Sequence, residues 1–199
     1  MGRSGMPLRK MEKNNMITKN KKLYQINYIN RYDLLSYTQQ KINDINNRSI
    51  IIIPNLCNIN YTYGGSISKQ IAEAYPIVEE SYNVIGKVFI NQHPGYVQFI
   101  ETMKNKSNKL FVANMIAQTG VARKPYQRTI NYAYLVESMQ QIKKFVCQQK
   151  IKYNDEHFNI SIHSYKFGIG KHCNGDWNFI TDLFVDILLP YSNIFIFHK

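Results

Sequence analysis

Apolar and polar positions follow two periods along the chain, one typical of strands and one of helices. The continuous β-branched run at 50–53 predicts a strand buried on both faces of a sheet. Apolar positions near a 3.6-residue period at 130–150 predict a long amphipathic helix. Further strands are expected at 24–29, 96–103, 110–117, 159–163 and 194–197, and further helices at 67–75, ended by Pro76, and 176–188. Because strands alternate with helices, we expect an α/β fold, a three-layer α/β/α sandwich with a mixed, largely parallel sheet.

The composition indicates one folded domain with a basic extension. The 199 residues are 44% hydrophobic, too apolar for a disordered chain, and no apolar run approaches the roughly 20 residues of a membrane span. Residues 1–22 hold seven basic residues and one acidic residue, which is half of the net charge of +12. We therefore expect a disordered tail over 1–22 and a single domain over 23–199.

Three cysteines without C-x-x-C spacing argue against a disulfide framework and against a zinc knuckle. This cysteine usage indicates a reducing, cytoplasmic compartment. A bias towards Ile, Asn, Lys and Tyr fits an AT-rich genome of viral or phage type, in which case the compartment is the host cytoplasm. The basic tail suggests, at most, weak nucleic-acid binding that falls steeply with salt.

Two glycine clusters mark the expected ligand site. Gly64-Gly65 and the group Gly168, Gly170 and Gly175 each follow a predicted buried strand and precede a helix. Ligands of open α/β sheets bind outside the carboxyl ends of strands, where glycines let backbone N–H groups approach an anion. Two such loops suit a diphosphate, although glycines also serve simply to turn corners. Neither loop has the G-K-[ST] or G-x-G-x-x-G pattern of the common NTPase and dinucleotide sites.

Three segments, in order, carry a family resemblance. PNLCNIN at 54–60 with GGSISKQIA at 64–72 forms the first, FVANMIAQ at 111–118 the second, and SIHSYKFGIG at 161–170 with GDW at 175–177 the third. They resemble the first ligand loop, a central strand and the second phosphate loop of the macro domains, which bind ADP-ribose. Within that family they are most similar to the phage and bacterial branch related to terminal ADP-ribose protein glycohydrolase. The resemblance covers about residues 24 to 198 and implies a macro-domain fold.

The resemblance assigns ligand-binding positions one by one. It places Asp33 at the adenine amino group, although Tyr32 stands where the family has glycine, and it places Asn58 near the distal ribose. The other implied ligand-binding residues are Gly64, Gly65, Ser66, Ile67 and Ser68 around the distal ribose and one phosphate, and Gly168, Ile169, Gly170 and Lys171 along the diphosphate. It implies a monomer that needs no cofactor.

Catalytic residues carry over less directly. Where the glycohydrolase branch has a lysine that attacks the ribose, this sequence has Gln118, and an amide cannot form the covalent adduct. The acidic residue of the second loop falls near His172, which is expected to act as a general acid or base, or else to be solvated. The resemblance therefore implies an enzyme that hydrolyses a bond at the distal ribose of protein-linked ADP-ribose or ADP-ribose 1″-phosphate. The alternative is a non-catalytic binder that sequesters ADP-ribose or a related nucleotide.

Two further hypotheses concern residues near these loops. His163, His172 and Cys173 have the residue types of a metal site, but His163 lies inside a predicted strand and should point away from the loop, so no metal is expected. Lys124 lies in a basic loop after the strand that carries Gln118, where it either covers the phosphates or is solvated. A Gly168→Val substitution is expected to fill the diphosphate space without unfolding the domain.

Overall fold

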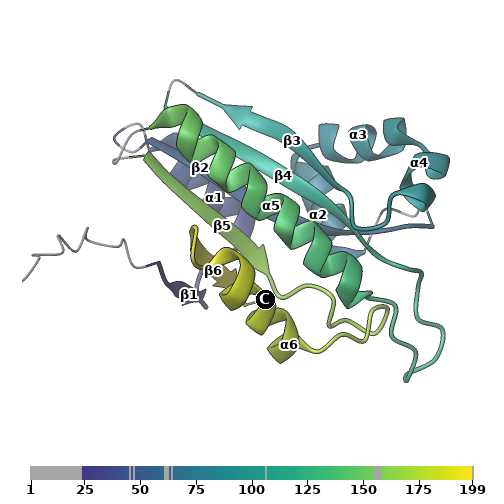
Figure 1. Ribbon diagram of the computed structural model, residues 1–199. Coiled ribbons are helices and arrows are strands. Elements are labelled where there is room, and N and C mark those ends of the chain that lie inside the picture. The colour runs from purple at the N-terminus through teal and green to yellow at the C-terminus, as the bar shows by residue number, and fades with distance from the viewer. Residues whose placement is uncertain are drawn as a thin grey trace, which may run out of the picture.

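One six-stranded sheet with helices on both faces makes up the computed structural model (Figure 1). The structure describes residues 24–44, 46, 48–60, 63, 65–105, 107–154 and 158–198, so the predicted tail at 1–22 lies outside it. The strands are β1 (Ile26–Ile29), β2 (Arg48–Asn58), β3 (Val97–Lys104), β4 (Asn108–Gln118), β5 (Phe158–Tyr165) and β6 (Asn193–Phe197). The helices are α1 (Leu34–Asn43), α2 (Ser66–Ala74), α3 (Ile77–Ile85), α4 (Lys87–Gln92), α5 (Tyr132–Tyr153) and α6 (Trp177–Leu183), which continues as the π-helix η1 (Phe184–Leu188).

The sheet is mixed and largely parallel, as predicted. Its strand order is β1-β6-β5-β2-β4-β3. Every neighbouring pair is parallel except β3 and β4, which form an antiparallel hairpin. Because β2, β4 and β5 are parallel neighbours, their carboxyl ends meet at one edge of the sheet, the edge at which α/β folds bind ligands.

Two apolar layers separate the sheet from its helices. Ile50 and Ile52 of β2 face the core beneath α5, α6 and η1, while Ile51 and Ile53 face the core beneath α1 and α2. Each of the four is at most 2% exposed, which confirms that the 50–53 strand is buried on both faces. In Figure 1, α5 crosses the front of the sheet, and α1 and α2 lie behind it. The three-layer α/β/α sandwich is therefore confirmed.

Three helices were missed by the sequence pattern: α1, α3 and α4. Helix α1 buries Leu34, Thr38 and Ile42, so a polar residue interrupts its apolar stripe. Pro76 ends α2 as predicted, but it is also the N-cap residue of α3. Over the described ranges, no helix combines the length and the apolar content that crossing a membrane requires.

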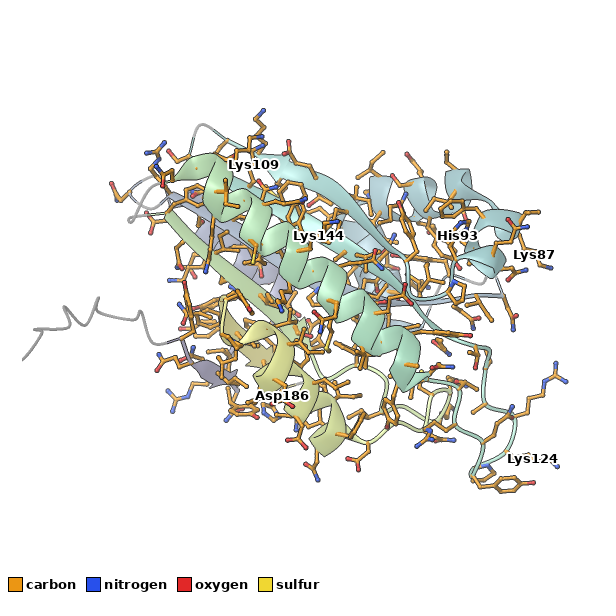
Figure 2. All side chains as sticks on the ribbon, in the orientation of Figure 1. Lys87, His93, Lys109, Lys124, Lys144 and Asp186 are labelled. Atoms are coloured by element: carbon orange, nitrogen blue, oxygen red, sulfur yellow. The ribbon has the colours of Figure 1, made fainter. Side chains whose placement is uncertain are left out.

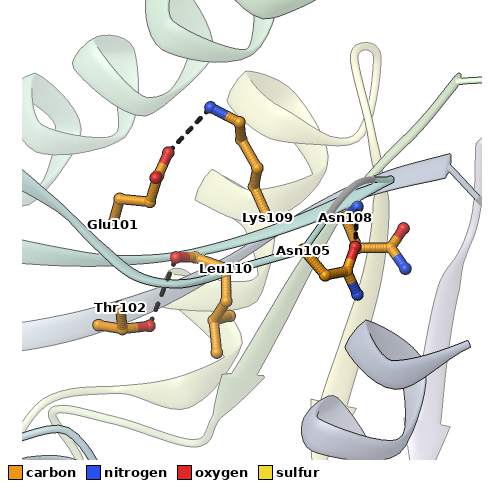
Figure 3. A network of polar contacts seen from close by, with 6 residues as sticks. All are labelled: Glu101, Thr102, Asn105, Asn108, Lys109 and Leu110. Atoms are coloured by element: carbon orange, nitrogen blue, oxygen red, sulfur yellow. Dashed lines mark hydrogen bonds and ion pairs between the residues drawn. The ribbon is translucent and has the colours of Figure 1, made fainter. Parts of the chain in front are cut away.

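Asparagine side chains organise the end of the sheet opposite the ligand-binding edge (Figure 3). The Asn108 backbone N–H donates to Asn105 Oδ1 at 2.6 Å in the turn between β3 and β4. Both side-chain amides donate to the Ile42 carbonyl, at 2.8 and 2.7 Å. Because that carbonyl belongs to the last turn of α1, the turn caps this helix and fixes it against the sheet.

The buried His163 gives folding a pH dependence. Its Nδ1 lies 2.8 Å from Thr38 Oγ1 and its Nε2 lies 3.2 Å from Ser161 Oγ. Burial, with a smaller contribution from the Lys41 charge, lowers the pKa of His163 to about 3. The unfolded chain, in which a histidine titrates near pH 6.5, therefore takes up a proton that the folded chain excludes. Stability from this group is complete above about pH 6.5 and is lost as the pH falls from there towards 3.

We expect the free energy of unfolding to fall below pH 6 by up to about 1.4 kcal/mol per pH unit from this residue. Urea denaturation at pH 7, 6 and 5 measures the slope. In His163→Asn, which keeps a neutral hydrogen-bonding side chain, the slope should be shallower than in the wild type. Equal slopes in the two proteins would show that His163 is not the group responsible.

Candidate functional site

Two adjoining pockets open at the carboxyl ends of β2, β4 and β5. Their volumes are about 320 and 290 Å³. Six residues line both pockets: Leu56, Gly65, Ser68, Gln118, His172 and Cys173. Because the pockets share these residues, they adjoin one another, and we call the two together the cleft. Its residues come from both glycine loops and from the strand ends between them.

The first loop presents the N-terminus of α2 to the cleft. Gly65 is the N-cap residue and supplies no side-chain cap. Ile67 and Ser68 line the cleft, and the first-turn N–H groups of a helix have no partner within the helix. These donors and the helix dipole favour an anion at this position. Gly64 and the Ser66 side chain, also predicted to contact the ligand, lie outside the part of the structure that can be described.

The second loop folds back on itself between β5 and α6. The Gly175 N–H donates to the Gly168 carbonyl at 2.8 Å, and the Cys173 N–H donates to the Gly170 carbonyl at 2.8 Å. Within the described ranges, no acceptor takes the N–H groups of Ile169 or Gly170, and both residues line the cleft. Residues of both glycine loops therefore line one space.

Gly168 and Gly170 differ in the space around them and therefore in what a substitution would do. Gly168 has φ +76°, and a Cβ added there would lie 2.6 Å from Ile130 Cδ1 and 3.3 Å from Ile180 Cδ1. A Cβ added at Gly170 meets no atom within 4 Å. Gly168→Val is therefore expected to destabilise the fold, because this glycine packs against the core in a conformation that side chains disfavour. Gly170 is the glycine that tests the cleft.

A buried amide network that sequence reasoning missed supports the first loop. Asn55 is 1% exposed, and its Nδ2 donates to Asn114 Oδ1 at 2.7 Å and to the Tyr63 hydroxyl at 2.9 Å. The Ser68 hydroxyl donates to Asn55 Oδ1 at 2.8 Å. Strands β2 and β4 thus hold Tyr63 and the first turn of α2 through side chains. The available signal was an asparagine inside the apolar stretch of each strand, Asn55 in β2 and Asn114 in β4, which the register places opposite one another.

Asn58 and Asp33 occupy different positions relative to the cleft. Asn58 lines it, and its Oδ1 accepts from the Asn60 N–H at 2.7 Å, so this side chain shapes the turn after β2. Asp33 does not line the cleft. It caps α1 by accepting from the Ser36 N–H at 3.0 Å, and it accepts from the hydroxyl of Tyr165, which lines the cleft. Asp33 therefore stands one side chain behind the cleft wall.

The Asp33 carboxylate keeps its charge in this setting. Burial raises its pKa, but hydrogen bonds from Tyr165 and Ser36 together outweigh burial and lower the pKa below its usual value. The Tyr165 pKa is raised by burial and by this same acceptor. Asp33 is thus a charged acceptor, and the protonated hydroxyl of Tyr165 donates to it from the side of the cleft.

The structure brings Gln118 and His172 together on one wall. Gln118 Nε2 donates to the Gly120 carbonyl at 2.6 Å and lies 3.5 Å from the His172 carbonyl. That carbonyl also accepts from Thr129 Oγ1 at 2.7 Å. The backbone of His172 is therefore fixed, and this exposed residue lines both pockets. This arrangement places a proton acceptor and a side-chain amide beside the same space.

Two thiols line the cleft. Burial raises the pKa of Cys57, and it raises the pKa of Cys173 against a weaker opposing hydrogen bond from Thr129. Because the thiolate is the nucleophilic form, both thiols are poor nucleophiles at neutral pH.

His163 does not lie with His172 and Cys173, the other two residues with metal-ligating side chains named above. His163 packs beneath α1, whereas His172 and Cys173 border the cleft. In the part of the chain that the structure describes, no three His, Cys, Asp or Glu side chains gather as a metal site requires.

Comparison with known proteins identifies the fold. No protein-family model matches the chain, and no curated protein matches it either. Among solved structures, a protein of unknown function from Bacteroides thetaiotaomicron superposes with a TM-score of 0.68 at 22% identity, over 87% of this chain and 98% of that one. A macrodomain protein from Streptomyces coelicolor gives 0.61 at 18% identity, over 87% and 99%.

A third similar structure is a complex with ADP-ribose. Thermosipho africanus DarTG in complex with ADP-ribose gives a TM-score of 0.52 at 8% identity, over 85% of this chain and 52% of that one. At these identities the similarity shows the fold alone. The chain has the macrodomain fold that its sequence resemblance implied.

Proposed function

We propose that the cleft binds ADP-ribose. The observation that carries this proposal is that the α2 N-terminus and the Ile169–Gly170 segment line the same pocket. Backbone N–H donors of such segments suit a diphosphate, because they bind anions without a fixed positive charge. The macrodomain fold and the ADP-ribose complex of Thermosipho africanus DarTG support the same ligand.

In the proposed complex the diphosphate lies between the two loops. The adenosine end then extends towards Tyr165, whose hydroxyl lies between Asp33 and the cleft. The distal ribose extends towards Asn58, Gln118 and His172 in the other half of the cleft.

Calorimetric titration with ADP-ribose tests this function. We expect a Kd below about 100 μM, which corresponds to roughly −5.5 kcal/mol. AMP lacks the second phosphate and the distal ribose, so it should bind at least about 10-fold more weakly. If ADP-ribose does not bind at millimolar concentration, the proposed ligand is wrong.

The proximity of His172 and Gln118 favours hydrolysis at the distal ribose as the activity of this complex. In the proposed step, a water oxygen bonds to the anomeric carbon as the bond to the leaving oxygen breaks. His172 accepts the water proton and returns a proton to the leaving oxygen, and Gln118 orients the water. For the 1″-phosphate the water attacks phosphorus instead. The alternative is a binder that sequesters ADP-ribose, because Gln118 occupies the position of the family's attacking lysine.

His172→Ala separates the two alternatives. If the protein is a hydrolase, turnover of ADP-ribosylated protein or of ADP-ribose 1″-phosphate should fall by about 100-fold, because general-base catalysis is lost. The Kd for ADP-ribose should stay within about 3-fold, since the loop backbone holds the diphosphate. If the wild type binds ADP-ribose but turns over neither substrate, the binder is the correct alternative.

A further inference from the structure

The positive charge of the domain is concentrated beside the cleft. Residues 23–199 carry 18 basic and 12 acidic residues, a net charge of +6. Five of the 18 basic residues lie in the segments 119–131 and 166–175, which contain no acidic residue before Asp176: Arg123, Lys124, Arg128, Lys166 and Lys171. In the described part of the chain, none of the five forms an ion pair. Like charges gathered without counter-charges create a positive potential that attracts an anion.

A separate pocket lies within this basic region. Its volume is about 390 Å³, and Arg123, Arg128, Gln127 and Asn60 contribute to its walls. It adjoins the distal half of the cleft, because Val121 lines both spaces. The pocket therefore lies next to the proposed distal-ribose site.

Backbone contacts fix this pocket relative to the cleft. The Ala122 N–H donates to the His172 carbonyl at 3.0 Å, and the Thr129 N–H donates to the Cys173 carbonyl at 3.0 Å. Asn174 Nδ2 donates to the Gln127 carbonyl at 2.7 Å. The basic segment is thus bound to the second glycine loop, while Lys124 lies further out on the projecting loop (Figure 2).

We propose that Arg123 and Arg128 form an anion subsite for a phosphate group that the ligand carries beyond its distal ribose. Two guanidinium groups match the double negative charge of a phosphate monoester, and each can donate two parallel hydrogen bonds to its oxygens. The Arg128 guanidinium lies 4.8 Å from the Tyr132 ring centre, which limits its orientations. The placement of the remaining ligand rests on the proposed function.

Calorimetry with ADP-ribose and ADP-ribose 1″-phosphate tests the subsite, with KM in place of Kd if the latter is turned over. The wild type should bind the phosphorylated ligand at least about 10-fold more tightly. In Arg123→Gln/Arg128→Gln this difference should shrink to within about 2-fold, with ADP-ribose affinity unchanged. Lys144→Gln removes the same kind of charge from α5 (Figure 2) and should preserve the difference. Both arginines are exposed, so the thermal unfolding midpoint should not change.

The outcomes separate this inference from the proposed function. A difference that persists in the double variant overturns the subsite and leaves ADP-ribose binding intact. If ADP-ribose itself fails to bind, the proposed function falls, and inorganic phosphate titrated alone then tests the subsite. If the wild type and the double variant bind inorganic phosphate with equal affinity, the proposed arginine subsite is wrong. If the variant instead loses affinity only for an ADP-ribosylated acidic peptide, the anion is a carboxylate and the phosphate assignment is wrong.

Discussion

Gly170→Val is expected to abolish ADP-ribose binding and to leave the fold unchanged. An added Cβ meets no atom within 4 Å, and Gly170 lines the cleft, so we expect valine to crowd the N–H groups proposed to hold the diphosphate. We expect the Kd for ADP-ribose to rise at least about 100-fold, or roughly 2.7 kcal/mol. The thermal unfolding midpoint should stay within about 2 °C of the wild-type value, because the new atoms contact no core residue. Calorimetry and circular dichroism measure the two quantities.

Gly170→Ala and Gly168→Val serve as controls for this result. Alanine adds one carbon and should produce an intermediate loss of affinity. Gly168→Val should lower the free energy of unfolding by at least about 2 kcal/mol, since its Cβ meets Ile130 and its φ is positive. Wild-type affinity in Gly170→Val would place the diphosphate elsewhere.

Asn55→Leu is expected to reduce both stability and affinity. Leucine fits a similar volume but leaves Asn114 Oδ1 without its 2.7 Å donor and the Ser68 hydroxyl without its acceptor. Each unsatisfied buried group costs about 1–3 kcal/mol, so the free energy of unfolding should fall by about 2–5 kcal/mol. ADP-ribose affinity, measured well below the unfolding midpoint, should fall at least about 10-fold, because Tyr63 and α2 lose their attachment to β2.

A double-mutant cycle with Asn114→Leu isolates the contact between the two asparagines. The double variant should lose less stability than the sum of the single variants, with a coupling of at least about 1 kcal/mol. Urea denaturation of the four proteins gives this value. Additive losses, within about 0.5 kcal/mol, would contradict the paired arrangement.

The pattern of apolar and polar residues was sufficient to predict the strands of the sheet. It was not sufficient to predict helix α1, which buries a polar side chain against the sheet. The 50–53 run predicted a strand buried on both faces because strand side chains alternate between faces. Helix α1 escaped notice because Thr38, which occupies its buried stripe, is satisfied by His163, 125 positions away in sequence. A polar side chain can be buried as fully as an apolar one when another element provides its hydrogen-bond partner. Sequence periodicity does not reveal such partners.

The site was predictable to the level of loops and not of individual atoms. The order of strand, glycine and helix located both loops correctly at the carboxyl ends of strands. The sequence did not distinguish Gly168, which packs on Ile130, from Gly170, which faces open space. It also did not reveal that Asp33 is engaged by Tyr165, because that contact depends on how α1 lies against β5.

The position of β1 at the sheet edge sets the order in which the domain can be completed during synthesis. The Gln25 N–H donates to Asn193 Oδ1 across 168 positions, and β1 pairs with β6 from Ile26↔Ile194 to Ile29↔Phe197. Strand β1 is therefore synthesised well before β6, the strand with which it pairs. Contacts between such distant segments form slowly, so nascent chains arrested before β6 should expose an unpaired edge to proteases and chaperones.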